Sequence, residues 1–225
     1  MLQFSIANLL IVECSGESFS ATSRRPGKSS CVNSMNILKE KLVLASRSPR
    51  RAEILRAIGW AFKAIAANVD ETRNPTEDAV SYVRRLAESK AETVAKTVSD
   101  GVVIGADTVV VIDGEILGQP SDDDDARRML QLLNGREHEV LTGVALVRAG
   151  QTSDVIVDQE TTRVRFTEMS ADEIDCYVST GEPKGKAGAY AIQGRGALFI
   201  EEIRGDYFNV VGLPVRLIYE MFDKL

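Results

Sequence analysis

Residues 102–112 have the sequence Val-Val-Ile-Gly-Ala-Asp-Thr-Val-Val-Val-Ile, and this stretch decides the fold of the chain. Val and Ile fill most of it, which is typical of a strongly apolar, buried β-strand. Asp113-Gly114 follows at once and is a signal for a tight hairpin. The run therefore predicts a long strand that ends in a hairpin turn.

Strands and helices alternate on both sides of this run. We expect strands at residues 42–45, 62–66, 140–148, 161–166 and 197–203, and helices at residues 49–58, 75–98, 122–133, 170–180 and 214–224. Ser48, Ser121 and Ser170 are the expected caps at three helix starts. Interleaved strands and helices predict the α/β class with a mixed sheet.

The composition limits the chemistry. The chain has 225 residues, a net charge of -6, three cysteines and one histidine, His138. An acidic chain is a poor general binder of nucleic acid, because phosphate contacts need a basic face. One histidine excludes a histidine-rich metal site, so any metal must be held by carboxylates and phosphates, which suits Mg²⁺ or Mn²⁺. The scattered cysteines fit a reducing compartment, and we expect the cytoplasm.

The first 34 residues differ from the remainder of the chain. They combine a short apolar run with a stretch rich in Ser, Gly and Arg, whereas Met35 immediately precedes the first patterned strand. We expect residues 1–34 to be a disordered or mis-assigned extension and residues 35–225 to be the domain; a transit peptide stays an alternative. No segment approaches the length of a membrane span, so no membrane partner is expected.

The segment Ser46-Arg-Ser-Pro-Arg-Arg51 lies between a predicted strand and a predicted helix start. Free backbone N–H groups and the helix dipole attract anions at such a place. Its hydroxyls and arginines strengthen that attraction, because arginine binds phosphate oxygens through two N–H groups. The segment predicts phosphate binding, and the alternative is an ordinary capped helix with solvated arginines.

Asp107 is the sharpest candidate, because it lies among aliphatic residues. A lone buried carboxylate is costly unless it binds a metal or performs acid–base chemistry. The alternative is a strand end where Asp107 meets water or an arginine. Lys90 lies on the apolar stripe of the helix predicted at 75–98, either to contact the site or to extend its amine outward to solvent.

Other candidates carry weaker signals. Glu71 lies in a polar loop, Asp122 to Asp125 are acids at a helix start, and His138 is expected to be structural. The glycine-rich segment 182–194 is suited to a close approach of backbone to a ligand, and it supplies Lys184, Lys186 and Gln193 as polar contacts.

Three motifs occur in a fixed order: Ser46-Arg-Ser-Pro-Arg-Arg51, then Gly105-Ala-Asp-Thr-Val109, then Lys186-Ala-Gly-Ala-Tyr-Ala-Ile-Gln-Gly194. Thr142-Gly143 and Val211-Gly-Leu-Pro214 fit the same pattern. Together they resemble the Maf family of nucleotide pyrophosphatases, from about Leu42 to the C-terminus. The resemblance implies an elongated, mixed, twisted sheet with two lobes and a cleft between them. It also implies metal-dependent hydrolysis of a nucleoside triphosphate to the monophosphate and pyrophosphate.

The resemblance assigns roles to individual residues. Asp107 matches the general base, and Asp107 and Glu71 match the metal-handling carboxylates. The expected substrate-binding residues are Ser46, Arg51, Glu71, Lys90 and Lys186, and those expected to govern substrate choice are Arg50, Thr108 and Gln193. Arg50, with the Gly-Ala-Tyr and Ile-Gln-Gly patterns, resembles the branch that acts on dTTP and UTP, which cleans nucleotide pools and is linked to the arrest of cell division.

One position departs from the family. Gln119, in Leu117-Gly-Gln-Pro120, stands where the family usually has a lysine, so a cation near the triphosphate is missing. Two alternatives stay open: a pyrophosphatase for purine or 7-methyl-GTP nucleotides, and a non-catalytic nucleotide-binding regulator of septum formation. The retained Asp107, Glu71 and Lys90 argue against the regulator, because a pure binder needs no base. A homodimer also stays open.

Overall fold

A computed structural model describes residues 40–150 and 155–225. The extension expected at residues 1–34 and the expected start at Met35 lie outside these described residues. The strands are β1 (Leu42–Leu44), β2 (Phe62–Ala64), β3 (Val102–Ile112), β4 (Glu115–Leu117), β5 (Glu137–Arg148), β6 (Val155–Phe166) and β7 (Ile200–Arg204). The helices are α2 (Pro49–Ala57), α3 (Ala79–Ala95), α4 (Asp123–Leu133), α5 (Ala171–Ser179), α6 (Tyr207–Val211) and α7 (Val215–Phe222), with short 3₁₀ turns η1 (Ala187–Ala189) and η2 (Arg195–Phe199).

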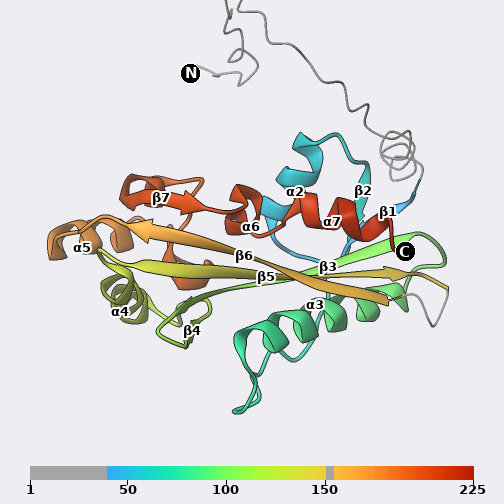
Figure 1. The fold of residues 1–225 in the computed structure, drawn as a ribbon, viewed down its shortest axis with the longest axis horizontal. Helices are drawn as coiled ribbons and strands as arrows, with labels where there is room; N and C mark the ends of the chain where they lie inside the picture. The colour runs from blue at the N-terminus through green and yellow to red at the C-terminus, as the bar shows by residue number, and fades with distance from the viewer. Residues whose placement is uncertain (1–39, 151–154) are drawn as a thin grey trace, which may run out of the picture.

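The described strands form one mixed sheet in the order β2-β1-β3-β5-β6-β7, with β4 paired to β3. The pairs β1–β2 and β1–β3 are parallel, and the other pairs are antiparallel. Strands β3, β5 and β6 run along the long axis of the molecule (Figure 1), and α3 covers one face while α2, α6 and α7 lie on the other. This elongated mixed sheet confirms the predicted fold class.

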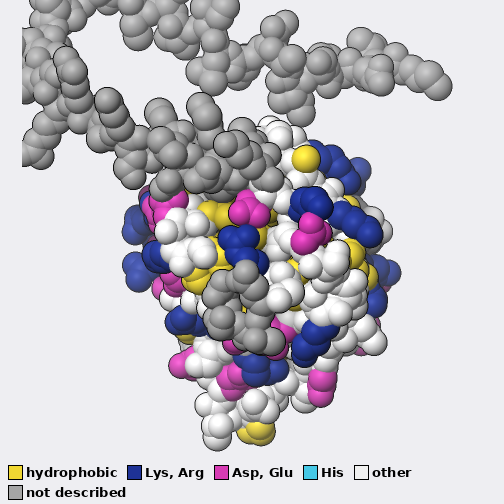
Figure 2. Space-filling model, turned by 90° about the vertical axis from the view of Figure 1, so that its right-hand side faces the viewer, with side chains coloured by type: hydrophobic (Ala, Val, Ile, Leu, Met, Phe, Trp, Pro, Cys, Tyr) yellow, Lys and Arg dark blue, Asp and Glu magenta, His cyan; other side chains and the backbone are white. Residues whose placement is uncertain are grey.

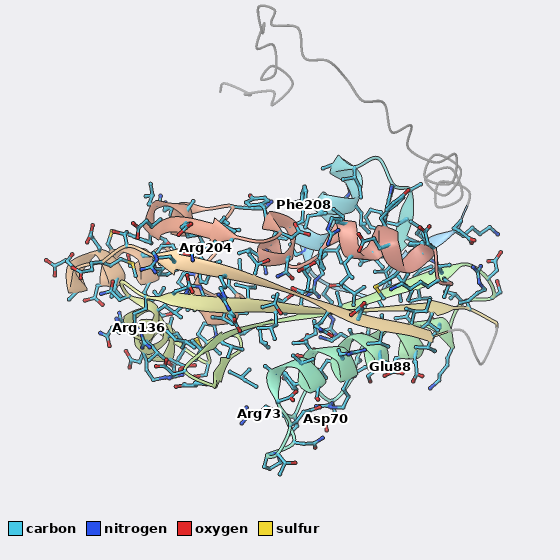
Figure 3. The ribbon with its side chains drawn as sticks, in the orientation of Figure 1. Asp70, Arg73, Glu88, Arg136, Arg204 and Phe208 are labelled. Atoms are coloured by element: carbon cyan, nitrogen blue, oxygen red, sulfur yellow. The ribbon has the colours of Figure 1, made fainter. Side chains whose placement is uncertain are left out.

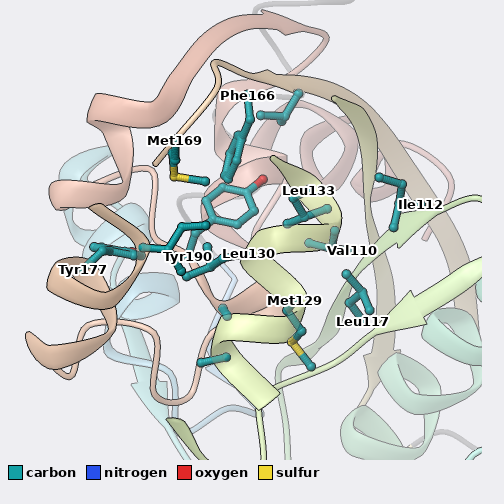
Figure 4. Close-up of a cluster of buried hydrophobic side chains, with 14 of the residues drawn as sticks. Val110, Ile112, Leu117, Met129, Leu130, Leu133, Phe166, Met169, Tyr177 and Tyr190 are labelled. Carbon is teal, nitrogen blue, oxygen red and sulfur yellow. The ribbon is translucent and has the colours of Figure 1, made fainter. Parts of the chain in front are cut away.

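The long strands carry two lobes with separate cores. In the first lobe, the apolar residues of β1 and α2 pack with α7 and with one end of β3 and β5. In the second lobe, β4, α4 and α5 pack around Phe166 and Tyr190, whose rings meet edge to face at 4.8 Å (Figure 4). Because each core closes separately, the middle of β3 lies between the lobes.

Helix α3 touches the sheet backbone directly. A Cβ atom built on Gly105 of β3 would lie 2.1 Å from the carbonyl oxygen of Ala87, and one built on Gly143 of β5 would lie 2.3 Å from that of Val83. Glycine is therefore required at both positions for the helix to lie this close to the sheet. The close contact brings the inward face of α3, including Lys90, onto the middle of β3.

Several predicted boundaries are wrong. Strand β6 begins at Val155 rather than at residue 161, β5 begins at Glu137 rather than at residue 140, and α3 ends at Ala95 rather than at residue 98. Helix α3 begins after Asp78, whose side chain accepts from Ser81 N, so residues 75–78 lie outside it. The cap of α4 is Asp122, whose carboxylate accepts from Asp125 N, in place of Ser121. The strand expected at 197–203 is the turn η2 followed by β7, and it begins only at Ile200.

The surface carries charges of both signs. In the end view of Figure 2, Lys and Arg side chains are interspersed with Asp and Glu, and no broad basic face is visible in that view. Within residues 40–150 and 155–225, none of the helices has both the length and the apolar character needed to cross a bilayer.

Candidate active site

A cleft of about 610 Å³ opens at the edge of β3, between the lobes. Strand β1 pairs with β3 as far as Ile104, and β4 pairs with it from Val110 onward. The intervening segment of β3 has neither strand as a neighbour on that edge. The residues to which the family resemblance assigns roles all line this one cleft, namely Ser46, Arg50, Arg51, Glu71, Lys90, Asp107, Thr108, Lys186 and Gln193, and Gln119 lines it too. Lys184 was also expected at the site, but it does not line the cleft and instead forms an ion pair with Asp123.

Asp107 and Lys90 form a buried ion pair under α3. Lys90 Nζ lies 2.6 Å from Asp107 Oδ1 and 2.8 Å from Glu71 Oε1. The side chains of Lys90 and Asp107 are 11% and 13% exposed, whereas that of Glu71 is 56% exposed. One ammonium group therefore joins two carboxylates that are 36 positions apart in the sequence.

Burial raises the pKa of Asp107 above its ordinary value, although the positive charges of Lys90 and Arg51 partly counteract that rise. A carboxylate is a stronger base when its pKa is raised, and it stays largely ionised only where cations compensate its burial. Both conditions hold here, so Asp107 is suited to accept a proton from a molecule in the cleft.

Helix α3 also holds the loop that carries Glu71. Tyr82 Oη donates to the carbonyl oxygen of Glu71 at 2.9 Å, and Arg85 Nη2 donates to that of Thr72 at 3.1 Å. Asp70 and Arg73, which flank these two residues, lie where the loop projects beyond the end of α3 (Figure 3). Burial, followed by the negative charges of Asp107 and Glu71, raises the pKa of Tyr82. Tyr82 and Arg85 were not predicted from the sequence, because their role depends on the path of the loop.

Arg51 of α2 is held by hydrogen bonds on the face of β3 that is opposite to α3. Four of its five N–H groups have protein acceptors. Two of these are carbonyl oxygens: Nε donates to Gly212 O at 2.7 Å, and Nη1 donates to Ala106 O at 2.8 Å. The other two are hydroxyl oxygens: Nη1 also donates to Ser46 Oγ at 3.3 Å, and Nη2 donates to Thr108 Oγ1 at 3.0 Å. None of these acceptors is a carboxylate. Burial lowers the pKa of Arg51, and the charge of Asp107 opposes that effect. The guanidinium is thus a held, buried cation that an anion in the cleft would compensate.

Among the described residues, the hydroxyl group of Ser46 acts only as an acceptor, which leaves its proton available for a ligand. Its oxygen accepts from Ser48 N at 3.1 Å and from Arg51 Nη1 at 3.3 Å, which uses both of its lone pairs. Its proton is therefore directed away from these partners. Ser48 caps α2 by accepting from Arg51 N, with Pro49 in the first turn, as the sequence predicted. The Ser46–Arg51 turn presents a hydroxyl donor and a helix N-terminus at the cleft.

A directed chain of hydrogen bonds fixes Thr108. Thr142 Oγ1 donates to Asn209 O at 3.1 Å, so its single proton is already used. The 2.9 Å contact between Thr108 and Thr142 must then be donated by Thr108, which itself accepts from Arg51. Thr108 consequently has no proton left for a substrate and can offer it only an acceptor. From the sequence, Thr142 could be predicted only as part of a motif, because its partner Asn209 lies 67 residues away.

Arg50 of the Ser46–Arg51 turn lines the cleft, and the segment after α5 supplies Lys186 and Gln193. Burial lowers the pKa of Lys186, and the positive charge of Arg50 adds to that effect. Two cations that disfavour each other in this way would both gain from an anion between them. Gln193 is exposed, and its side-chain amide has no hydrogen-bond partner among the described residues.

The carboxylates could take part in holding a metal ion. Within residues 40–150 and 155–225, no three His, Cys, Asp or Glu side chains gather closely enough to do so alone. Mg²⁺ typically takes one or two protein carboxylates and completes its shell with water and substrate phosphates. Asp107 and Glu71, gathered around one ammonium group, fit that donor set.

His138 is structural. It is 2% exposed, and its Nε2 lies 2.9 Å from Tyr190 Oη in the core of the second lobe. Burial lowers the pKa of His138 to about 4. A catalytic triad that uses the sole histidine of the chain is thereby excluded.

A family model described as Maf-like protein matches residues 41–225. The chain belongs to the Maf family. Among curated proteins, a dTTP/UTP pyrophosphatase of Dictyoglomus thermophilum is 44% identical over 84% of this chain and 97% of its own length. A dTTP/UTP pyrophosphatase of Symbiobacterium thermophilum is 49% identical over 82% of this chain and 94% of its own. Among solved structures, that of the Staphylococcus aureus Ham1 protein matches 82% of this chain at 14% identity with a TM-score of 0.47.

The Maf assignment accounts for Gly212, which follows α6 in the Val211-Gly-Leu-Pro214 motif. Gly212 has φ +119, a conformation that favours glycine, and its carbonyl oxygen accepts from Arg51 Nε. This late motif therefore belongs to the same cleft as the first motif of the chain. The sequence showed the motif, and the structure shows that its carbonyl group holds Arg51.

Proposed function

We propose that this chain hydrolyses dTTP and UTP to the monophosphate and pyrophosphate. The observation that carries the proposal is the buried Asp107–Lys90 pair, with its raised carboxyl pKa, in the same cleft as the Ser46–Arg51 turn. Two curated relatives that cover most of the chain bear the same activity as their name.

The triphosphate binds against the Ser46–Arg51 turn. Ser46 donates its hydroxyl proton to a phosphate oxygen, and the start of α2 adds backbone N–H groups and a favourable dipole. Arg51 stays held by its carbonyl partners and acts through its charge and its one remaining N–H group. Arg50 of the same turn also lines the cleft, and Lys186 lies near enough to Arg50 for their positive charges to interact, so both are available to the phosphates.

Asp107 acts as the general base. It accepts a proton from the water that attacks the α-phosphorus, and Lys90 stabilises the carboxylate until that proton is transferred. Arg51 and Lys90 then stabilise the charge that develops on the phosphates. A divalent metal, held by Asp107 and Glu71 together with phosphate oxygens, would supply additional charge neutralisation and a more acidic water.

Gln193 and Arg50 select the nucleobase of the substrate. An amide offers one donor direction and one acceptor direction, which suits the edge of a pyrimidine. The amide of Gln193 has no partner within residues 40–150 and 155–225, and it reaches the cleft from a turn rather than from a strand. Thr108 contributes an acceptor alone, because its proton is used by Thr142.

We also propose that residues 35–225 are the functional unit and act on free nucleotides in the cytoplasm. The family match over residues 41–225 supports this boundary.

A nucleotide panel tests the reaction. Purified protein with Mg²⁺ or Mn²⁺ is given dTTP, UTP, GTP, ATP and 7-methyl-GTP, and the products are resolved as pyrophosphate and orthophosphate. We expect pyrophosphate plus monophosphate, with dTTP and UTP cleaved fastest. Orthophosphate plus diphosphate would refute the reaction, a purine preference would refute the substrate choice, and binding without turnover would favour a regulator.

A further inference from the structure

The side chain of Gln193 takes its position from a tight turn. Gly194 N donates to Ala191 O at 3.2 Å, which closes the turn from Ala191 to Gly194. Ile192 and Gln193, the two central residues, line the cleft. Because the amide of Gln193 has no partner among the described residues, its direction depends on how firmly this turn is held.

Two side chains outside the turn hold both of its ends. Tyr177 Oη of α5 accepts from Ala191 N at 3.2 Å and donates to Glu182 Oε1 at 2.8 Å. The carboxylate of Glu182 also accepts from Arg195 N and from Gly196 N, each at 3.0 Å. The backbone is therefore bonded on both sides of Gln193 to one connected pair of side chains, which we name the Tyr177–Glu182 clamp.

The clamp lies so close to the backbone that side chains are excluded beside it. A Cβ atom on Gly194 would lie 2.5 Å from the carboxyl group of Glu182. One on Gly196 would lie 2.7 Å from Ala191 O and 2.8 Å from Tyr177 Oη. Both glycines of the Gln193-Gly-Arg-Gly196 stretch are thus explained by close approach to the clamp.

The clamp is rooted in the second lobe. Tyr177 is 3% exposed, and its ring packs edge to face against Phe199 at 5.4 Å between centroids. In Figure 4, Tyr177 lies beside the cluster that contains Tyr190. Burial acts to raise the pKa of Glu182, but the hydrogen bonds from Arg195 N, Gly196 N and Tyr177, together with the charge of Lys186, outweigh it and hold that pKa below its ordinary value. The carboxylate is consequently ionised at neutral pH and can accept from several donors at once.

We propose that Glu182 and Tyr177 are positioning residues for base selection, which hold the Ala191–Gly194 turn so that Gln193 faces the nucleobase. This inference rests on the proposed function and adds two residues that do not touch the phosphates. It predicts that loosening the clamp changes which base is preferred and how tightly the nucleotide binds, with little effect on the chemical step.

Glu182→Gln is the sharpest variant, because it keeps the size of the side chain. Glutamine has one carboxamide oxygen, so it cannot accept from both Arg195 N and Gly196 N through separate oxygens. In either orientation its NH₂ group meets a backbone N–H group, and two donors repel each other. Tyr177→Phe is the second variant, since it removes only the hydroxyl group that joins Ala191 N to Glu182. Glu173→Gln on the same helix is the matched control, because Glu173 accepts from Ser170 N and Oγ in a capping box outside the cleft.

The full chain and its three variants are compared by kcat and KM for dTTP and GTP, by melting temperature, and by inhibition with inorganic tripolyphosphate. We expect Glu182→Gln and Tyr177→Phe to lower the ratio of kcat/KM for dTTP to that for GTP by about tenfold, the equivalent of one good hydrogen bond. The KM for dTTP should rise, kcat should stay within about twofold, and inhibition by tripolyphosphate should be unchanged. Glu173→Gln should lower the melting temperature without changing the ratio.

The clamp has no positioning role if both clamp variants keep the wild-type ratio, or if Glu173→Gln changes it equally. A loss of kcat for both nucleotides, with weaker inhibition by tripolyphosphate, would likewise overturn the inference, because the phosphate site would then be affected. If the wild type prefers GTP, the proposed substrate is wrong, but the clamp is still tested by the ratio between the two nucleotides that the wild type separates most.

Discussion

Asp107→Asn separates a catalytic carboxylate from a structural one. Asparagine keeps the shape of Asp107 and can still accept a hydrogen bond from Lys90 Nζ, which lies 2.6 Å from Oδ1. It cannot take a proton from water at neutral pH. If Asp107 is the general base, kcat should fall by about 10²–10⁴-fold.

The expected change in stability is small because two effects oppose each other. Removing one partner of a buried ion pair commonly costs about 3–5 kcal/mol, since the other charge is left unpaired. Here Lys90 keeps Glu71 at 2.8 Å, and the variant no longer buries a carboxylate whose pKa is raised by that burial. We expect a net change within about 1–2 kcal/mol, a shift of roughly 2–8 °C in melting temperature for a domain of this size.

The assay measures kcat, nucleotide affinity and melting temperature on one preparation. Asp113→Asn is the matched control, because Asp113 forms an ion pair with Arg136 outside the cleft. In the wild type, kcat/KM should rise with pH through the raised pKa of Asp107, and this limb should be missing from the residual activity of Asp107→Asn. Nucleotide affinity should persist, because the hydrogen bonds that hold Arg51 and Ser46 are untouched.

Two results would refute this reasoning. A near wild-type kcat in Asp107→Asn would show that another group is the base. A large loss of stability together with retained activity in the folded fraction would show that the Asp107–Lys90 pair only braces α3 against the sheet.

Three further predictions concern the cleft residue Gln119, the buried His138 and the start of the domain. Gln119→Lys should lower the KM for the triphosphate and leave the melting temperature unchanged; an unchanged or raised KM would mean that Lys186 already supplies the cation in this cleft. Because the pKa of His138 is lowered to about 4 in the folded state, the unfolded state binds the proton first, so stability should be lost by up to about 3 kcal/mol as pH falls from about 6.5 to 4. His138→Gln should reduce that slope in pH-dependent denaturation, and an equal slope in both proteins would contradict the assignment. A chain beginning at Met35 should keep the melting temperature and the activity of the full chain, and a large loss of either would show that residues 1–34 contribute to the domain.

Elements with strong local signals were predictable from the sequence. The apolar run at residues 102–112 is β3, and the Ser170–Glu173 capping box begins α5 as expected. The hairpin signal at Asp113-Gly114 corresponds to a turn in which both residues have positive φ, +50 and +80. These features depend on neighbours within a few positions, so the sequence alone contains their cause.

Elements that depend on distant partners were not predictable. Helix α6 has five residues and is held by Asn209, whose side chain donates to Val140 O and to Thr162 Oγ1. The middle of β6, from Asp158 to Thr161, is polar and gains its strand conformation by pairing with β5. The same limit applies to the site. The identities of Asp107 and Lys90 could be inferred, whereas the relay through Thr142 and the clamp at Glu182 depend on contacts that only the folded chain creates.

The contact between α3 and the sheet has a consequence for protein engineering. Exchanging strand glycine for alanine is a common way to raise heat resistance, and neither Gly105 nor Gly143 has a positive φ that would warn against it. At both positions the added methyl group would collide with a carbonyl oxygen of α3, and the helix would have to move away from the sheet. Because Lys90 lies on that helix, these substitutions would lower the stability of the protein and move Lys90 away from Asp107. Libraries built for thermal tolerance should therefore keep both glycines fixed.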